Sequence, residues 1–209
     1  MRKFAALTFL AISLFSVPAS AHNGDVATSR DGQSMVDPNS AVTIGGSFTM
    51  TDGNNQTVTD KNFLGKYMLL FFGFTSCPDV CPTEMQNVAN ALDILGAAGA
   101  GVVPILVTVD PERDTPEVMA TYTKRFSDRI VGLTGTKEQV AAIAKAYKVY
   151  YGRVEAKDVP ADHQSGAYAM DHSSYLYLMG PDGQFLQVFR SDLDANDLAS
   201  GLRAIVTMP

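Results

Sequence analysis

The chain has 209 residues, a length that suits one or two domains. Hydrophobic residues make up 46% and charged residues 18%, which is close to a soluble globular protein and too apolar for a disordered one. The net charge of −6 excludes a basic footprint for nucleic acid or an anionic membrane. With only two cysteines, Cys77 and Cys81, a disulfide-rich scaffold and an all-cysteine zinc site are excluded by count.

Residues 1–21 are typical of a secretory signal peptide. Two basic residues precede an apolar run of about 14 residues, which is shorter than the roughly 20 needed to span a bilayer as a helix. Ala19 and Ala21 form a small-residue cleavage site, and we predict cleavage after Ala21. An uncleaved membrane anchor is the alternative. The mature chain is therefore expected in an oxidising compartment such as a bacterial periplasm.

The rest of the chain divides into a leader and one domain. Residues 22–40 are polar, without hydrophobic periodicity, and read as a flexible leader. Residues 41–209 read as a single domain. No stretch after the signal segment is long and apolar enough to span a membrane, so we expect no span in the mature chain.

Within this domain the pattern predicts alternating strands and helices. Thr115 caps one helix with proline at its first position, and Thr136 with Gln139 forms a capping box at another. The alternation predicts an α/β fold with a central sheet, helices on both faces and a closing hairpin. Strands are expected over residues 41–50, 67–74, 102–109, 130–133, 175–179 and 184–190, with a short one after the turn at 51–55; helices are expected from 82 to about 98, from 115, over 136–150 and over 194–205.

The two cysteines lie where the buried strand over residues 67–74 turns into a helix. This is the carboxyl end of a strand, where α/β folds place their sites. Pro82 fits only the first turn of a helix, so we expect Cys81 at or beside the N-cap. A helix N-terminus favours thiolate over thiol, and Cys77 and Cys81 can then form a disulfide or chelate a soft ion such as Cu(I). A purely structural disulfide between Cys77 and Cys81 is the alternative. The loop that it would close is so small that it would constrain the unfolded chain little.

His172 is a candidate third ligand. It lies just before the strand over 175–179, and its ring would share the site if that strand neighbours the cysteine-bearing one. Two sulfurs and one imidazole suit copper. A lone histidine at a strand edge is more often a hydrogen-bonded surface residue, and His163 is the weaker candidate, in a loop.

Three ordered motifs resemble those of the Sco/SenC family of copper proteins that assemble cytochrome c oxidase. The first is Phe72-Gly73-Phe74-Thr75-Ser76-Cys77-Pro78-Asp79-Val80-Cys81-Pro82. The second is Val109-Asp110-Pro111-Glu112-Arg113-Asp114-Thr115-Pro116, and the third is Asp171-His172-Ser173 followed by Pro181-Asp182-Gly183. A CxxxC alone is a weak signal, but three motifs in order across residues 41–209 are a strong one.

The resemblance implies a thioredoxin-like fold with a central mixed sheet flanked by helices and an N-terminal β-hairpin. It also implies one copper ion, Cu(I) or Cu(II), held by Cys77, Cys81 and His172. The implied partners are a copper donor protein and the oxidase subunit that receives copper, whose cysteines the protein would load or reduce. Family members often keep an N-terminal membrane helix, and the cleavage site predicted here departs from that pattern. Asp110 and Asp114 are expected to cap and fix loops, because hard carboxylates add little to a Cu(I)–thiolate site.

The rival interpretation is a periplasmic thiol–disulfide oxidoreductase or peroxidase on the same fold, with Cys77 and Cys81 as its redox pair. Against it stand the three residues between the cysteines, where two are usual, and the absence of a proline just before Tyr175. In its favour, the dithiol must itself be reduced before copper can bind. The two activities are compatible, so the sequence alone leaves both open.

Overall fold

The structure is a computed structural model that describes residues 43–155, 157 and 168–207. Two short 3-10 helices, Asp60–Phe63 and Gly96–Gly99, accompany the longer elements. The strands and α-helices, in chain order, are β1 (Thr49–Asp52), β2 (Thr57–Thr59), β3 (Tyr67–Gly73), α1 (Val80–Leu95), β4 (Val102–Thr108), α2 (Pro116–Thr123), β5 (Val131–Thr134), α3 (Lys137–Ala146), β6 (Tyr151–Glu155), β7 (Tyr168–His172), β8 (Tyr175–Met179), β9 (Phe185–Arg190) and α4 (Ala195–Val206).

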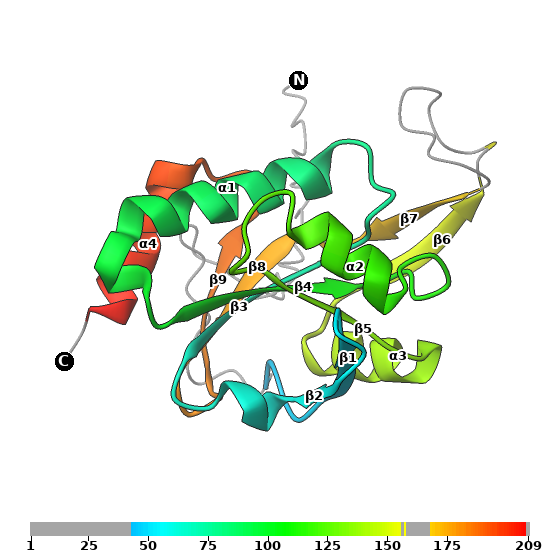
Figure 1. The fold of residues 1–209 in the computed structure, drawn as a ribbon, viewed down its shortest axis with the longest axis horizontal. Helices are drawn as coiled ribbons and strands as arrows, with labels where there is room; N and C mark the ends of the chain where they lie inside the picture. The colour runs from blue at the N-terminus through cyan, green and yellow to red at the C-terminus, as the bar shows by residue number, and fades with distance from the viewer. Residues whose placement is uncertain (1–42, 156, 158–167, 208–209) are drawn as a thin grey trace, which may run out of the picture.

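A mixed sheet of seven strands forms the centre of the molecule, in the order β2-β1-β5-β4-β3-β8-β9 (Figure 1). The strands β3, β4 and β5 run parallel, while β1, β8 and the outer strands pair antiparallel. The pair β1–β2 is the expected N-terminal hairpin. A separate two-stranded ribbon, β6–β7, was not expected from the sequence.

Helices cover both faces of the sheet, as predicted. The parallel β3–β4–β5 unit places α1 and α2 on one face, because such crossovers are right-handed. The helix α4 packs beside α1 on that face (Figure 1). On the other face the ring of Tyr147, directly after α3, lies 5.6 Å from that of Phe72.

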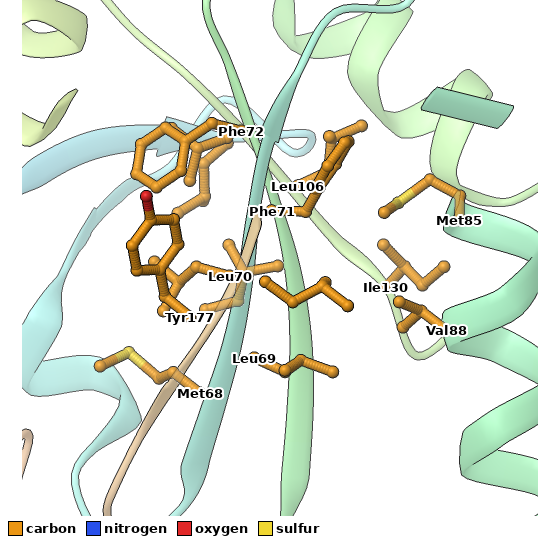
Figure 2. Packing of buried hydrophobic residues seen from close by; sticks show 14 of the residues in the cluster. Met68, Leu69, Leu70, Phe71, Phe72, Met85, Val88, Leu106, Ile130 and Tyr177 are labelled. Carbon is orange, nitrogen blue, oxygen red and sulfur yellow. The ribbon is translucent and has the colours of Figure 1, made fainter. Parts of the chain in front are cut away.

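The central strand β3 is buried on both sides, which explains its continuous apolar sequence. Phe71 points towards Met85 and Val88 on α1, whereas Phe72 points the opposite way towards Tyr177 (Figure 2). Successive side chains of a strand alternate between faces, so one apolar run supplies both halves of the core. The strand is thereby held rigidly up to its carboxyl end, where the cysteines follow.

Two boundaries differ from the sequence expectation. The first strand begins at Thr49, not at residue 41, and residues 41–42 lie outside the described part of the chain. The helix predicted over 136–150 ends at Ala146, and Lys148 beyond it has a positive φ of 58°. The capping box of Thr136 and Gln139 is present as predicted. In the part of the chain that the structure describes, no helix is long and apolar enough to cross a membrane.

Candidate metal centre

Cys77 and Cys81 lie at the carboxyl end of β3, as the sequence predicted. Cys77 is half-buried in the loop, and Cys81 is fully buried. The N-cap of α1 is Asp79, so Cys81 is the second residue of the helix and not its cap. The helix starts slightly earlier than expected, because Pro82 is tolerated throughout the first turn and does not mark the helix start. Both cysteines are free thiols.

The two thiols differ strongly in acidity. The side chain of Cys81 donates a hydrogen bond to Cys77, and backbone N–H groups of Cys81 and Asp79 add to it, which together lower the pKa of Cys77 to about 5 against the opposing effect of burial. The same hydrogen bond, followed by burial, raises the pKa of Cys81. The pair therefore carries one thiolate and one thiol, and the N–H groups at the start of α1 help to stabilise that charge.

His172 faces the dithiol from the end of β7. Its Nε2 lies 3.8 Å from Sγ of Cys81, and its Nδ1 lies 3.1 Å from the carbonyl oxygen of Ser173. When Nδ1–H donates to that carbonyl, the lone pair of Nε2 points to the sulfur, which is the arrangement of a metal-ligating imidazole. The rings of Phe71 and Phe74 each meet the imidazole edge-on at 6.0 Å and limit its rotation.

The sheet order explains how His172 reaches cysteines about ninety positions earlier. The strand β8 pairs antiparallel with β3, so the start of β8 lies beside the end of β3, with Leu176 opposite Phe71. His172 lies three residues before β8 begins. The sequence analysis made the approach of His172 conditional on this pairing, and the pairing is present.

Asp114 fixes the loop that leads to the cysteines. It is fully buried and accepts hydrogen bonds from the backbone N–H of Thr75 at 3.1 Å, the hydroxyl of Thr75 at 2.6 Å and the hydroxyl of Thr108 at 2.6 Å. Burial raises the pKa of Asp114 against the effect of these hydrogen bonds. The loop-fixing role expected for Asp114 is confirmed.

Gly73, the last residue of β3, makes room for the buried sulfur. A Cβ at this position would lie 3.0 Å from Sγ of Cys81 and 2.8 Å from the ring of Phe71. Both distances are shorter than ordinary contacts, so any larger residue would displace the thiol. Glycine between two phenylalanines is thus required by the packing of Cys81.

The chemistry of the three donors fits copper, which accepts two sulfurs and one imidazole. Within the described residues, no group of three or more His, Cys, Asp or Glu side chains is already drawn together as a metal cluster. His163 lies outside the described residues.

Sequence reasoning missed the side chains that anchor the β6–β7 ribbon. Tyr168 stacks between Arg113 and Arg153, and its hydroxyl donates to Asp110 at 2.9 Å. Asp110 also pairs with Arg113. The signal that could have found the ribbon is the period of two in Tyr168, Met170 and His172, which is typical of a strand with one buried face.

Fold and site together define a thioredoxin-like protein with a dithiol and an imidazole at the carboxyl end of its central strand. The family model described as SCO1/SenC matches residues 36–207, so the chain belongs to the SCO1/SenC family. It is 41% identical over 163 residues to the mouse (Mus musculus) mitochondrial protein named Protein SCO1 homolog, covering 77% of this chain. The chain spans only 55% of that protein's length.

Two solved structures extend the similarity to three dimensions. Arabidopsis thaliana ScoI with copper bound has a TM-score of 0.70 at 37% identity, covering 77% of this chain and 96% of that one. Bradyrhizobium japonicum ScoI with copper bound has a TM-score of 0.67 at 39% identity, covering 77% and 98%. The predicted thioredoxin-like fold, with a mixed central sheet flanked by helices, is confirmed.

Proposed function

We propose that the chain is an exported copper metallochaperone. It would bind one copper ion through Cys77, Cys81 and His172 and deliver the ion to the copper centre of cytochrome c oxidase, or prepare that centre by reduction. The observation that carries the proposal is the position of Nε2 of His172, 3.8 Å from Sγ of Cys81, beside the Cys77 thiolate. The family and the copper-bound relatives support it.

In this proposal each ligand has a distinct task. Cys77 is already a thiolate and half-exposed, so it would meet the incoming ion first. Cys81 must lose its proton to ligate, so loading releases a proton. His172 supplies the nitrogen ligand that Cu(II) favours, while Cu(I) can persist on two thiolates. The proposed partners are a copper donor protein and the receiving oxidase subunit.

The proposal includes export to the periplasm and a division into three segments. Residues 1–21 would be a signal peptide cleaved after Ala21, residues 22–40 a leader, and residues 41–209 the copper-binding domain. The apolar run and the small residues before position 22 support this. Mass spectrometry of the protein recovered from its native host tests it: a chain starting at His22 is expected, and an intact Met1 terminus in the membrane fraction would indicate an anchor.

Competitive titration of Cu(I) and Cu(II) against a chelator tests the ligand set. The reduced wild type should bind about one copper per chain, and Cys77→Ser or Cys81→Ser should abolish tight binding because one thiolate and one imidazole hold Cu(I) poorly. His172→Ala should weaken Cu(II) more than Cu(I), and His163→Ala is the matched control. Wild-type affinity in both serine variants would refute the copper site.

A second candidate function is favoured by the acidity of Cys77. A thiolate with a pKa of about 5 beside a protonated Cys81 is the arrangement of a thiol–disulfide oxidoreductase. The Cys77 thiolate would attack a partner's disulfide, releasing one partner thiolate, and Cys81 would then displace the second as the Cys77–Cys81 disulfide forms. This couple needs no imidazole, so Cys77 and Cys81 should still cycle between thiols and disulfide in His172→Ala. If His172→Ala also leaves copper affinity unchanged, the oxidoreductase function becomes the better one.

A further inference from the structure

The ribbon β6–β7 carries His172 but is not part of the central sheet. In the part of the chain that the structure describes, β6 and β7 pair only with each other, with Tyr151 opposite His172 and Glu155 opposite Tyr168. No backbone ladder therefore fixes the ribbon against β3, which leads to the cysteines (Figure 1). The short link from His172 to β8 brings the histidine to the end of β3, and side chains must then fix the orientation of the ribbon.

One cluster of these attachments is at Tyr168, the residue that begins β7. Its ring lies between two guanidinium groups, with the central carbon of Arg113 at 4.0 Å and that of Arg153 at 3.9 Å from the ring centroid. Its hydroxyl donates to Oδ1 of Asp110 at 2.9 Å, and Nη1 of Arg113 donates to its carbonyl oxygen at 3.2 Å. Asp110 is itself buried in the loop between β4 and α2, so Tyr168 is anchored to the core domain.

Tyr168 and His172 lie on the same face of β7. Residues two and four apart on a strand share a face, so Met170 between them points the same way, and it packs against the hydrophobic core. Four residues of strand span about 13 Å. The strand β7 is thus anchored at its first residue, Tyr168, and carries His172 at its last.

The loop between β4 and α2 holds both halves of the candidate site. Asp110 and Arg113 bind Tyr168 on the histidine-bearing ribbon. Four residues after Asp110, Asp114 binds Thr75, which lies two residues before Cys77. A single short loop therefore sets where the imidazole lies relative to the sulfurs.

We propose that Tyr168 is a positioning residue of the copper site. Clamped by Arg113, Arg153 and Asp110, it holds the ribbon so that Nε2 of His172 faces Cys81. This inference rests on the proposed function, because it assigns to Tyr168 the orientation of a copper ligand. Tyr168 itself does not touch the metal, and its whole effect on copper passes through His172.

The inference predicts a specific pattern of affinities for Tyr168→Ala. Loss of a direct outer partner of a metal ligand weakens a site by about tenfold to a hundredfold, and Tyr168 acts on His172 only through the ribbon, so Cu(II) affinity should fall by up to that amount. Cu(I) affinity should fall less, because two thiolates can retain Cu(I). Tyr168→Phe keeps the stacked ring and removes only the hydroxyl, so its effect should be smaller. The dithiol needs no imidazole, so Cys77 and Cys81 should still cycle between thiols and disulfide in this variant.

The experiment combines competitive Cu(II) titration with a double-mutant comparison on the full chain. Tyr150→Ala is the matched control, because Tyr150 precedes the ribbon but its side chain is 63% exposed. If Tyr168 acts through His172, the variant carrying both Tyr168→Ala and His172→Ala should bind Cu(II) no more weakly than His172→Ala alone. The inference would be overturned if the double variant lost Cu(II) affinity by the product of the two single-variant losses. Wild-type Cu(II) affinity in both Tyr168 variants would overturn it too.

A measurement on copper-free protein provides an independent readout. In the wild type, nuclear Overhauser contacts should join the His172 ring to the rings of Phe71 and Phe74, and Tyr168→Ala should weaken them. Unchanged contacts would contradict the positioning role.

Failure of the proposed function gives a different result, because His172→Ala would then leave Cu(II) affinity unchanged. If His172→Ala weakens binding and the Tyr168 variants do not, the copper site stands and only the positioning role is refuted.

Discussion

Glu84→Gln should make the protein more stable at neutral and alkaline pH. Glu84 lies in α1, one turn after Cys81, with only 2% of its surface exposed, and its Oε2 has no hydrogen-bond partner among the described residues. Burial, and then the charge of Asp192, raise the pKa of Glu84 from 4.5 to about 8. Glutamine has nearly the same shape and cannot lose a proton, so it avoids the cost of a buried charge.

The magnitude follows from that shift. Because the folded-state pKa lies above the unfolded-state value, the folded protein binds more protons between pH 4.5 and pH 8. The contribution of Glu84 to the free energy of unfolding therefore falls by about 1.4 kcal/mol for each pH unit as the pH rises through this window. The advantage of Glu84→Gln should grow from near zero below pH 4.5 to about 3 kcal/mol at pH 7.

Urea denaturation of the wild type and Glu84→Gln at pH 4, 5.5, 7 and 8 measures this advantage, and other titrating groups cancel in the comparison. Glu117→Gln is the control. Glu117 is exposed, and its own backbone N–H and the Thr115 hydroxyl lower its pKa, so its substitution should bring no gain with rising pH. A pH-independent difference, or a less stable Glu84→Gln at pH 8, would refute the reasoning.

Three further outcomes are expected at the site. Gly73→Ala should cost about 1 to 3 kcal/mol by overpacking and weaken copper binding, because its Cβ would lie 3.0 Å from Sγ of Cys81; urea denaturation and copper titration measure both effects. Asp114→Ala should cost about 2 to 4 kcal/mol in the same denaturation assay, because it leaves the half-buried donors of Thr75 and the buried hydroxyl of Thr108 unpaired. In reduced, copper-free protein at pH 6, iodoacetamide should label Cys77 well before Cys81, and equal labelling by mass spectrometry would contradict the acidity difference.

Features with local causes were predictable from sequence. The buried strand β3 was recognised by its apolar run, and the caps of α2 and α3 by Thr115 and Thr136, because each signal acts within a few residues. The positions of Cys77 and Cys81 followed from the strand end that precedes them. The end of α3 was predicted several residues too late, because Lys148 adopts a positive φ that ends the helix and that the sequence does not reveal.

Features that depend on distant partners were not predictable from one sequence. The approach of His172 to Cys81 requires that β8 pair with β3, which no local pattern specifies. The alternation of Tyr168, Met170 and His172 is compatible with a strand, but the stacking of Tyr168 between two arginines from separate segments, which anchors the ribbon β6–β7, has no sequence signal. The sequence made His172 a candidate ligand only on the condition that its strand neighbours the cysteine-bearing one, and the family resemblance implied the same residue.

The unequal burial of the two sulfurs means that the candidate site is accessible from one side only, the side of Cys77. Cys81 is closed off behind Gly73 and Phe71, whereas Cys77 remains reachable from solvent. On the proposed function, an acceptor's ligand can approach the ion only past Cys77, so Cys77 is the first ligand to be exchanged and Cys81 the last. Copper would then leave one bond at a time, always held by at least one of the two proteins, and would never pass freely through solution.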